Sequence, residues 1–240
     1  MAHLVLLFLC ISLFQTACSN KVETPEPLLW INGTHAVLTE SNGGDIYLFG
    51  TLKHSSANRA MIRNTLENWW DVTTKQELDD VIDSLAEGRH NPTFLGEAEA
   101  YGITDMSREE FEHELRSIDD REIVMYFRNM FDAYQEFGEK AIMGWDLSRA
   151  TQLCAYGYIA DFYSYDEAAE KSLAIGRLIQ SNFGSWDDFY TSYFYGYAYW
   201  SDDDIEDPQS EYAKRVTIFN KLQEDSKSPL KLDWNLNLSR

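Results

Sequence analysis

Apolar residues recur every three or four positions along most of the chain, which is the spacing that one face of an α-helix produces. The clearest stretches are 78–85, 123–134 and 168–179. Residues 143–200 show the same spacing and hold three of the seven tryptophans. The pattern predicts a mainly α fold, with a single multi-helix domain over residues 29–224.

Polar residues between these stretches predict where helices begin and end. A Ser or Thr followed three residues later by an acidic residue can cap the first turn of a helix. Three starts are predicted in this way, at Thr74 with Glu77, Ser107 with Glu110 and Ser185 with Asp188. Gly88 predicts a helix end, and Asn91-Pro92 a loop.

Two regions of the domain lack a helical period. Residues 36–39 and 46–49 are short apolar runs around the turn-forming sequence Ser41-Asn42-Gly43-Gly44. Residues 35–50 are therefore expected to form either a short β-hairpin or an irregular segment between short helical pieces. Residues 225–240 are expected to form a C-terminal tail.

The N-terminus resembles an export signal. Residues 4–14 are apolar, a run too short to span a bilayer but typical of a signal peptide. Thr16-Ala17-Cys18 resembles a bacterial lipobox, although Gln15 and the lack of Lys or Arg depart from that pattern. We expect a signal peptide at 1–17, a lipid on Cys18 and a tether over 18–28. This predicts a lipid-anchored protein of the bacterial cell envelope; the alternatives are a secreted or a cytoplasmic protein.

The net charge of the chain limits the classes of partner that it can bind. The formal net charge is −20, and a surface this acidic repels nucleic acid. The acidity favours a basic protein or a cationic ligand as partner, or serves only to keep the protein soluble. Hydrophobic residues make up 44% of the chain, which is typical of a globular protein and excludes wholesale disorder.

No motif indicates a cofactor, a metal or a catalytic residue. His35, His54, His90 and His113 are scattered, without the spacing of a metal site. Phosphate-binding loops, dinucleotide fingerprints and nucleophile elbows are missing from the sequence. Cys154 has helical spacing from apolar neighbours, which predicts a buried thiol and not a nucleophile.

Asp146 and Arg149 are the main candidate site residues. They lie three residues apart, so one side of a helix brings them together. They can form a buried structural ion pair, or they can line a pocket with Trp145, Trp186 and Tyr193 in which the guanidinium binds a carboxylate or phosphate. An Arg149 that is fully occupied, with no cavity beside it, would exclude the pocket.

The aromatic residues after Ser185 fall into two sets. One set follows a helical stripe and predicts core packing, with a close helix approach at the glycine: Trp186, Phe189, Tyr193, Gly196 and Trp200. The other set lies off the stripe and would form a protein-binding patch if exposed: Tyr190, Tyr195 and Tyr199.

Several segments carry a family resemblance over roughly residues 29–200. They are Glu67-Asn68-Trp69-Trp70-Asp71-Val72, Gly88-Arg89-His90, Trp145-Asp146-Leu147-Ser148-Arg149-Ala150, Gly157-Tyr158, Asp166-Glu167-Ala168 and Ser185-Trp186. In order and spacing they resemble the bacterial family of domain of unknown function 1266. The resemblance implies a helical fold and carries over no activity, cofactor or catalytic residue.

Two functions remain open from the sequence. The first is a non-enzymatic, envelope-anchored module that binds or inhibits a basic protein, as an immunity protein does. The second is an enzyme or small-ligand receptor with a pocket near Asp146 and Arg149.

Overall fold

The computed structural model describes residues 24–201 and 203–239, which are mainly α-helical and contain no strand. The predicted signal peptide and Cys18 lie outside this range. The α-helices of the described residues are α1 (Glu26–Thr34), α2 (Ala36–Ser41), α3 (Ser56–Trp70), α4 (Lys75–Ala86), α5 (Asn91–Ala100), α6 (Arg108–Leu115), α7 (Arg121–Phe137), α8 (Met143–Ile159), α9 (Tyr165–Asn182), α10 (Trp186–Trp200) and α11 (Glu211–Glu224). Short 3-10 helices lie at Ile103–Asp105, Gly138–Lys140 and Pro229–Lys231.

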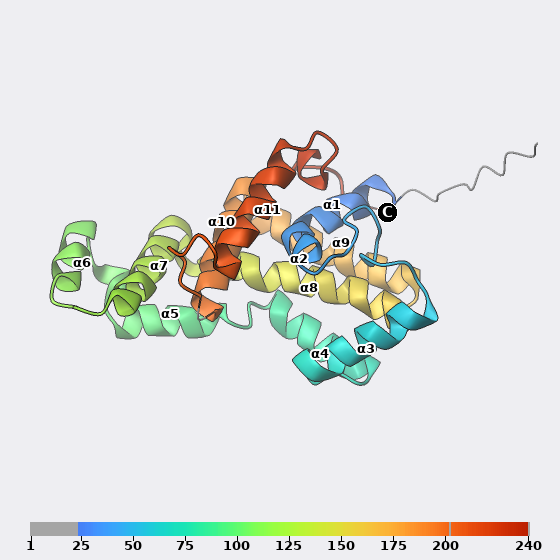
Figure 1. The fold of residues 1–240 in the computed structure, drawn as a ribbon, viewed down its shortest axis with the longest axis horizontal. Coiled ribbons are helices and arrows are strands. Elements are labelled where there is room, and N and C mark those ends of the chain that lie inside the picture. The colour runs from blue at the N-terminus through green and yellow to red at the C-terminus, as the bar shows by residue number, and fades with distance from the viewer. Residues whose placement is uncertain (1–23, 202, 240) are drawn as a thin grey trace, which may run out of the picture.

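Helix α8 is the centre of the fold. Every residue from 144 to 157 is buried, because α4, α9 and α10 pack around this helix (Figure 1). A helix enclosed in this way is apolar or small-sided on most of its circumference. Its few charged residues, Asp146 and Arg149, are buried together with it.

Glycines allow α8 and α10 to approach closely. A Cβ placed on Gly144 would lie 2.5 Å from the Phe189 carbonyl oxygen and 2.7 Å from the Tyr193 nitrogen. On the other helix, a Cβ on Gly196 would collide with Trp145. The predicted close approach at Gly196 is therefore confirmed.

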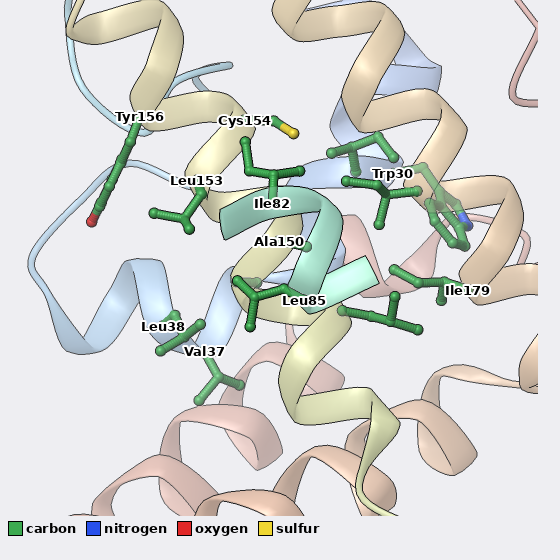
Figure 2. Close-up of a cluster of buried hydrophobic side chains, with 14 of the residues drawn as sticks. Trp30, Val37, Leu38, Ile82, Leu85, Ala150, Leu153, Cys154, Tyr156 and Ile179 are labelled. Carbon is green, nitrogen blue, oxygen red and sulfur yellow. The ribbon is translucent and has the colours of Figure 1, made fainter. Parts of the chain in front are cut away.

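The main core surrounds α8. Figure 2 shows Ile82 and Leu85 from α4 beside Leu153 and Cys154 from α8, all buried. Burial raises the pKa of the Cys154 thiol to about 12, so the sulfur remains protonated and serves as a small apolar core group, as predicted.

A second, smaller core lies at the end of the molecule formed by α5, α6 and α7 (Figure 1). Phe111 and Phe131 stack at its middle, with ring centroids 4.1 Å apart. Helix α7 belongs to this core and also packs against α10. The second core is thus joined to the first through α10.

The helix starts largely follow the predicted caps. Full capping boxes form at Thr74 with Glu77 and at Ser107 with Glu110. Ser185 caps α10, but the Asp188 carboxylate accepts from the Gly184 N–H instead of from Ser185. One expectation is wrong: Asn91-Pro92 is no loop but the first turn of α5, where proline is tolerated because that N–H has no helical partner.

The N-terminal expectations need two corrections. The predicted tether over 18–28 is too long, because α1 begins at Glu26 and Leu28 is already buried. Residues 36–41 form helix α2 and residues 42–55 are irregular, so the hairpin alternative for 35–50 is wrong and the alternative of an irregular segment beside a short helix is confirmed.

Residues 225–239 do not form a free tail. Leu230, Trp234 and Leu238 are buried, and the Trp234 indole N–H donates to the Phe183 carbonyl at 3.1 Å. The segment lacks a long helix because its apolar residues do not have a helical period. It nevertheless packs as an extended strap against the main core.

The condition for a tyrosine patch on α10, exposure of the tyrosines off the stripe, is not met. Tyr190 is fully buried, and its hydroxyl donates to the Gly33 carbonyl at 2.7 Å. Tyr195 and Tyr199 are partly buried and donate to Glu136 and Glu97. Helices α7, α8 and α11 all pack on α10. They therefore bury residues of α10 that lie outside its apolar stripe as well as those on it.

Candidate functional site

The ion pair predicted on α8 forms in the interior. Arg149 Nη2 lies 2.5 Å from Asp146 Oδ1, and the Asp146 carboxylate is fully buried. Their spacing of three residues on one helix brings the two side chains to the same side. Asp146 therefore sits behind Arg149, with no exposure of its own.

His90 completes this group, although it comes from outside α8. Its backbone N–H donates to Asp146 Oδ2 at 2.8 Å, and its ring Nδ1 lies 2.7 Å from Oδ1. Gly88, whose φ is +83°, lies in the turn after α4, and His90 follows at the position before the first residue of α5. One buried carboxylate thus binds both His90 and Arg149.

Arg149 is held on further sides by aromatic rings and backbone. Its guanidinium carbon lies 4.4 Å from the Trp145 ring centroid and 5.7 Å from that of Trp70, and Nε donates to the Trp145 carbonyl. Burial lowers the pKa of Arg149 to about 10, against the opposing effect of Asp146. The guanidinium is still charged at neutral pH.

A cavity of about 720 Å³ lies directly beside this group. Arg149 and His90 form part of its wall. The other lining residues come from α2, α3, α8, α10, α11 and the loops after α2, α3 and α4, and they include Trp69, Trp70, Trp145, Gln152, Tyr156, Trp200 and Arg215. Such a volume is in the range of small-ligand sites.

The wall of the cavity is cationic, in contrast to the protein as a whole. Arg89, Arg149 and Arg215 all line it, and Asp71 is the one carboxylate residue among the lining residues. Arg89 forms no ion pair with any residue in the described ranges, and Arg215 contacts Tyr193 and Tyr197 instead of a carboxylate. Because Asp146 neutralises Arg149, the positive charges on this wall without a carboxylate partner are those of Arg89 and Arg215.

Three buried donors of the cavity wall have no acceptor. They are Trp145 Nε1, Gln152 Nε2 and Arg215 Nε. Burying a donor without an acceptor costs about 1–3 kcal/mol, so native structures rarely contain several together. Each of these three nitrogens is itself buried, so the donors lie within the wall and do not face the cavity space.

The rim of the cavity is apolar. Trp69 is 79% exposed, Trp200 52% and Met61 50%, which places three of the most exposed large apolar side chains of the described residues on this opening. Large exposed apolar residues gathered in one place mark binding surfaces more often than scattered ones do. The cavity thus combines a cationic wall with an apolar entrance.

Only three of the five site residues predicted from the sequence lie together in the structure. Asp146, Arg149 and Trp145 lie together as expected. Tyr193 lies behind the wall, with its ring 5.2 Å from Trp145 and its hydroxyl accepting from Arg215 at 3.1 Å. Trp186 belongs to the main core, where it packs on Trp30 and Trp234, away from the cavity.

His90, Arg89 and Arg215 were missed as site residues in the sequence. His90 and Arg89 belong to the Gly88-Arg89-His90 segment, so the family resemblance was the signal that marked them. Arg215 had no such signal, because it lies on α11 among exposed charged residues.

Other kinds of site are not indicated within residues 24–201 and 203–239. No group of three or more His, Cys, Asp or Glu side chains is arranged to hold a metal ion. None of the helices in these ranges has the length and apolar character needed to cross a bilayer.

Fold and site together define an all-α domain with a cationic, aromatic-rimmed cavity beside a buried His-Asp-Arg group. The chain belongs to the family described as "Protein of unknown function (DUF1266)", whose model matches residues 65–234. The matched range includes His90, Asp146, Arg149 and Arg215. No curated protein and no solved structure matches the chain significantly.

Proposed function

We propose that the protein binds a small organic anion in the cavity beside Arg149. The observation that carries this proposal is the cavity wall, where Arg89 and Arg215 have no carboxylate partner among the described residues and lie beside the Arg149–Asp146 pair, with Asp71 as the single lining carboxylate. Guanidinium groups bind carboxylates and phosphates through paired, charge-assisted hydrogen bonds. The condition that would have excluded a pocket, a fully occupied Arg149 without a cavity, is not met.

The apolar rim supports an anion that also has an apolar part. Trp69 and Trp200 can cover a flat or aliphatic group while the acidic end reaches the arginines. An inorganic ion would leave this apolar surface in contact with water. We therefore expect an amphipathic ligand, such as an aromatic carboxylate or phosphate.

Three ligands with one skeleton test the proposal. Calorimetric titration compares 1-naphthylmethylphosphonate, 1-naphthalenemethanol and 1-naphthylmethylamine, which are anionic, neutral and cationic. We expect saturable, salt-sensitive binding of the phosphonate alone. Equal affinity for the neutral alcohol would contradict the proposal, because the arginines would then contribute nothing.

Substitutions locate the binding in this cavity. Arg89→Gln and Arg215→Gln should each weaken phosphonate binding about tenfold, the effect of losing one charge-assisted hydrogen bond. Arg128→Gln is the matched control, because Arg128 is an exposed arginine paired with Glu112 outside the cavity. An equal loss in the control would show that only net charge matters.

A basic protein partner is the second candidate. A smaller hollow of about 520 Å³ lies between α7 and the chain after α10, lined by the apolar Tyr101, Ile123 and Phe127 and by the acidic Glu122 and Asp204. Acidic edges around apolar centres suit basic partners. Affinity capture with wild-type protein and with Ile123→Glu tests this: a basic partner captured equally by both would argue against this surface.

A further inference from the structure

The histidine beside the cavity has a defined protonation pattern. A carboxylate offers only acceptors, so the hydrogen bond of 2.7 Å between Asp146 Oδ1 and His90 Nδ1 places a proton on Nδ1. Arg149 Nη2 lies 2.9 Å from the same nitrogen, but both groups carry hydrogens there and both donate to Asp146. The neutral ring therefore has its lone pair on Nε2.

This lone pair is available to a ligand. His90 lines the cavity with 27% of its side chain exposed, and Nε2 has no partner among the described residues and is not buried. The bonds from Asp146 to both the backbone and the ring of His90 fix the direction of the imidazole. A fixed basic nitrogen thus lies in the wall of a cavity that Arg89 and Arg215 also line.

We propose that the cavity is a hydrolytic site for phosphate monoesters of apolar alcohols, in which His90 Nε2 is the general base and Asp146 a positioning residue. This rests on the proposed anion binding. The arginines hold the phosphate and stabilise the charge that develops on its oxygens, while the tryptophan rim covers the alcohol part.

The step balances without a further reactant. Nε2 takes a proton from a water molecule as the water oxygen bonds to phosphorus and the phosphorus–oxygen bond to the alcohol breaks. The departing oxygen, on the opposite side of phosphorus, takes a proton from solvent water, and the imidazolium returns its proton to the solvent. The products are inorganic phosphate and the alcohol, and His90 returns to its neutral form with Nδ1–H still bound to Asp146.

Hydrolysis of 1-naphthyl phosphate, followed by the fluorescence of 1-naphthol, tests the inference. His90→Asn keeps a donor for Asp146 and removes the basic nitrogen, so we expect the rate to fall at least about 100-fold. Binding of 1-naphthylmethylphosphonate should change less than about threefold, since the arginines remain. His90→Gln serves as a second variant if the first does not fold.

The variant Asp146→Asn distinguishes a positioning role of Asp146 in the reaction from a purely structural role. The variant should lower kcat for 1-naphthyl phosphate about tenfold and leave KM within about threefold, because the imidazole loses its fixed direction while the arginines remain. An unchanged kcat would remove the positioning role. A wild-type protein that binds the phosphonate but does not hydrolyse the ester, or a His90→Asn variant with full rate, overturns the hydrolytic inference and leaves the proposed binding intact. Lack of phosphonate binding would refute both.

Discussion

The Asp146 carboxylate accepts the backbone N–H of His90 at 2.8 Å and lies 2.7 Å from its ring nitrogen. One buried side chain of α8 thereby fixes both the path and the ring of a residue 56 positions earlier in the chain. The same carboxylate holds Arg149. Removing it would leave a buried guanidinium without a counter-charge.

Asp146→Ala should therefore lower the free energy of unfolding by about 3–5 kcal/mol, as expected for breaking a buried ion pair. Urea unfolding measures this. The control Asp132→Ala breaks a pair with Arg108 at the surface and should cost less than about 1 kcal/mol. If Asp146→Ala costs no more than the control, the buried pair does not hold this part of the fold.

A second prediction concerns His35, which is buried on the α1–α2 junction with Nδ1 bonded to Thr39. Burial lowers its pKa from 6.5 to about 4. Between pH 6.5 and pH 4 the unfolded chain therefore binds a proton at His35 that the folded protein does not bind. The free energy of unfolding is accordingly highest above pH 6.5 and falls as the pH falls towards 4. The loss approaches about 3 kcal/mol, at about 1.4 kcal/mol per pH unit.

The slope of unfolding free energy against pH, measured between pH 5 and pH 6.5, checks this. His35→Asn should remove most of the slope, whereas substitution of the exposed His113 by Asn should leave it. A wild-type slope in the His35→Asn variant would assign the pH dependence to other groups.

The close contact of α8 with α10 gives a third prediction. Gly144→Ala places a methyl group against backbone atoms of Phe189 and Tyr193, which cannot move aside singly, so the variant should lose about 1–3 kcal/mol. Gly96→Ala on α5 has open space around it and should gain about 0.5–1 kcal/mol through helix propensity. Thermal unfolding of the two variants should show shifts of opposite sign.

The C-terminal strap gives a fourth prediction. Trp234 is 7% exposed and packs with Trp30 and Trp186, so Trp234→Ala should destabilise the protein by about 3–5 kcal/mol. Trp69→Ala, at a side chain 79% exposed, should cost less than about 0.5 kcal/mol. Similar values for the two variants would show that residues 225–239 behave as a free tail.

The lipid anchor proposed from the sequence is open to a direct test. Cells that express the full chain with a radioactive fatty acid should label the protein, and Cys18→Ala should abolish the label. Label that survives this substitution, or none in the wild type, would exclude lipidation at Cys18.

The helical fold could be predicted because it depends on local patterns. Apolar spacing and capping residues such as Thr74 and Ser107 act within one or two turns, so they are visible in the sequence. Asp146 and Arg149 were found for the same reason, since their pairing is a property of one helix. Predictions failed where one residue suits two local structures. Pro92 is an example, because proline is common both in loops and in the first turn of a helix, and here it lies in the first turn of α5.

The cavity could not be predicted from the sequence, because only the tertiary structure brings its lining residues together. Its arginines come from the turn after α4, from α8 and from α11, and no spacing rule links positions 89, 149 and 215. The same holds for Tyr190, which the helical stripe places outward and the packing of α11 buries. Sequence by itself determined which helices form, because helix formation is local. Only the packing of these helices decided which side chains meet, because burial depends on neighbours that lie far apart in the chain.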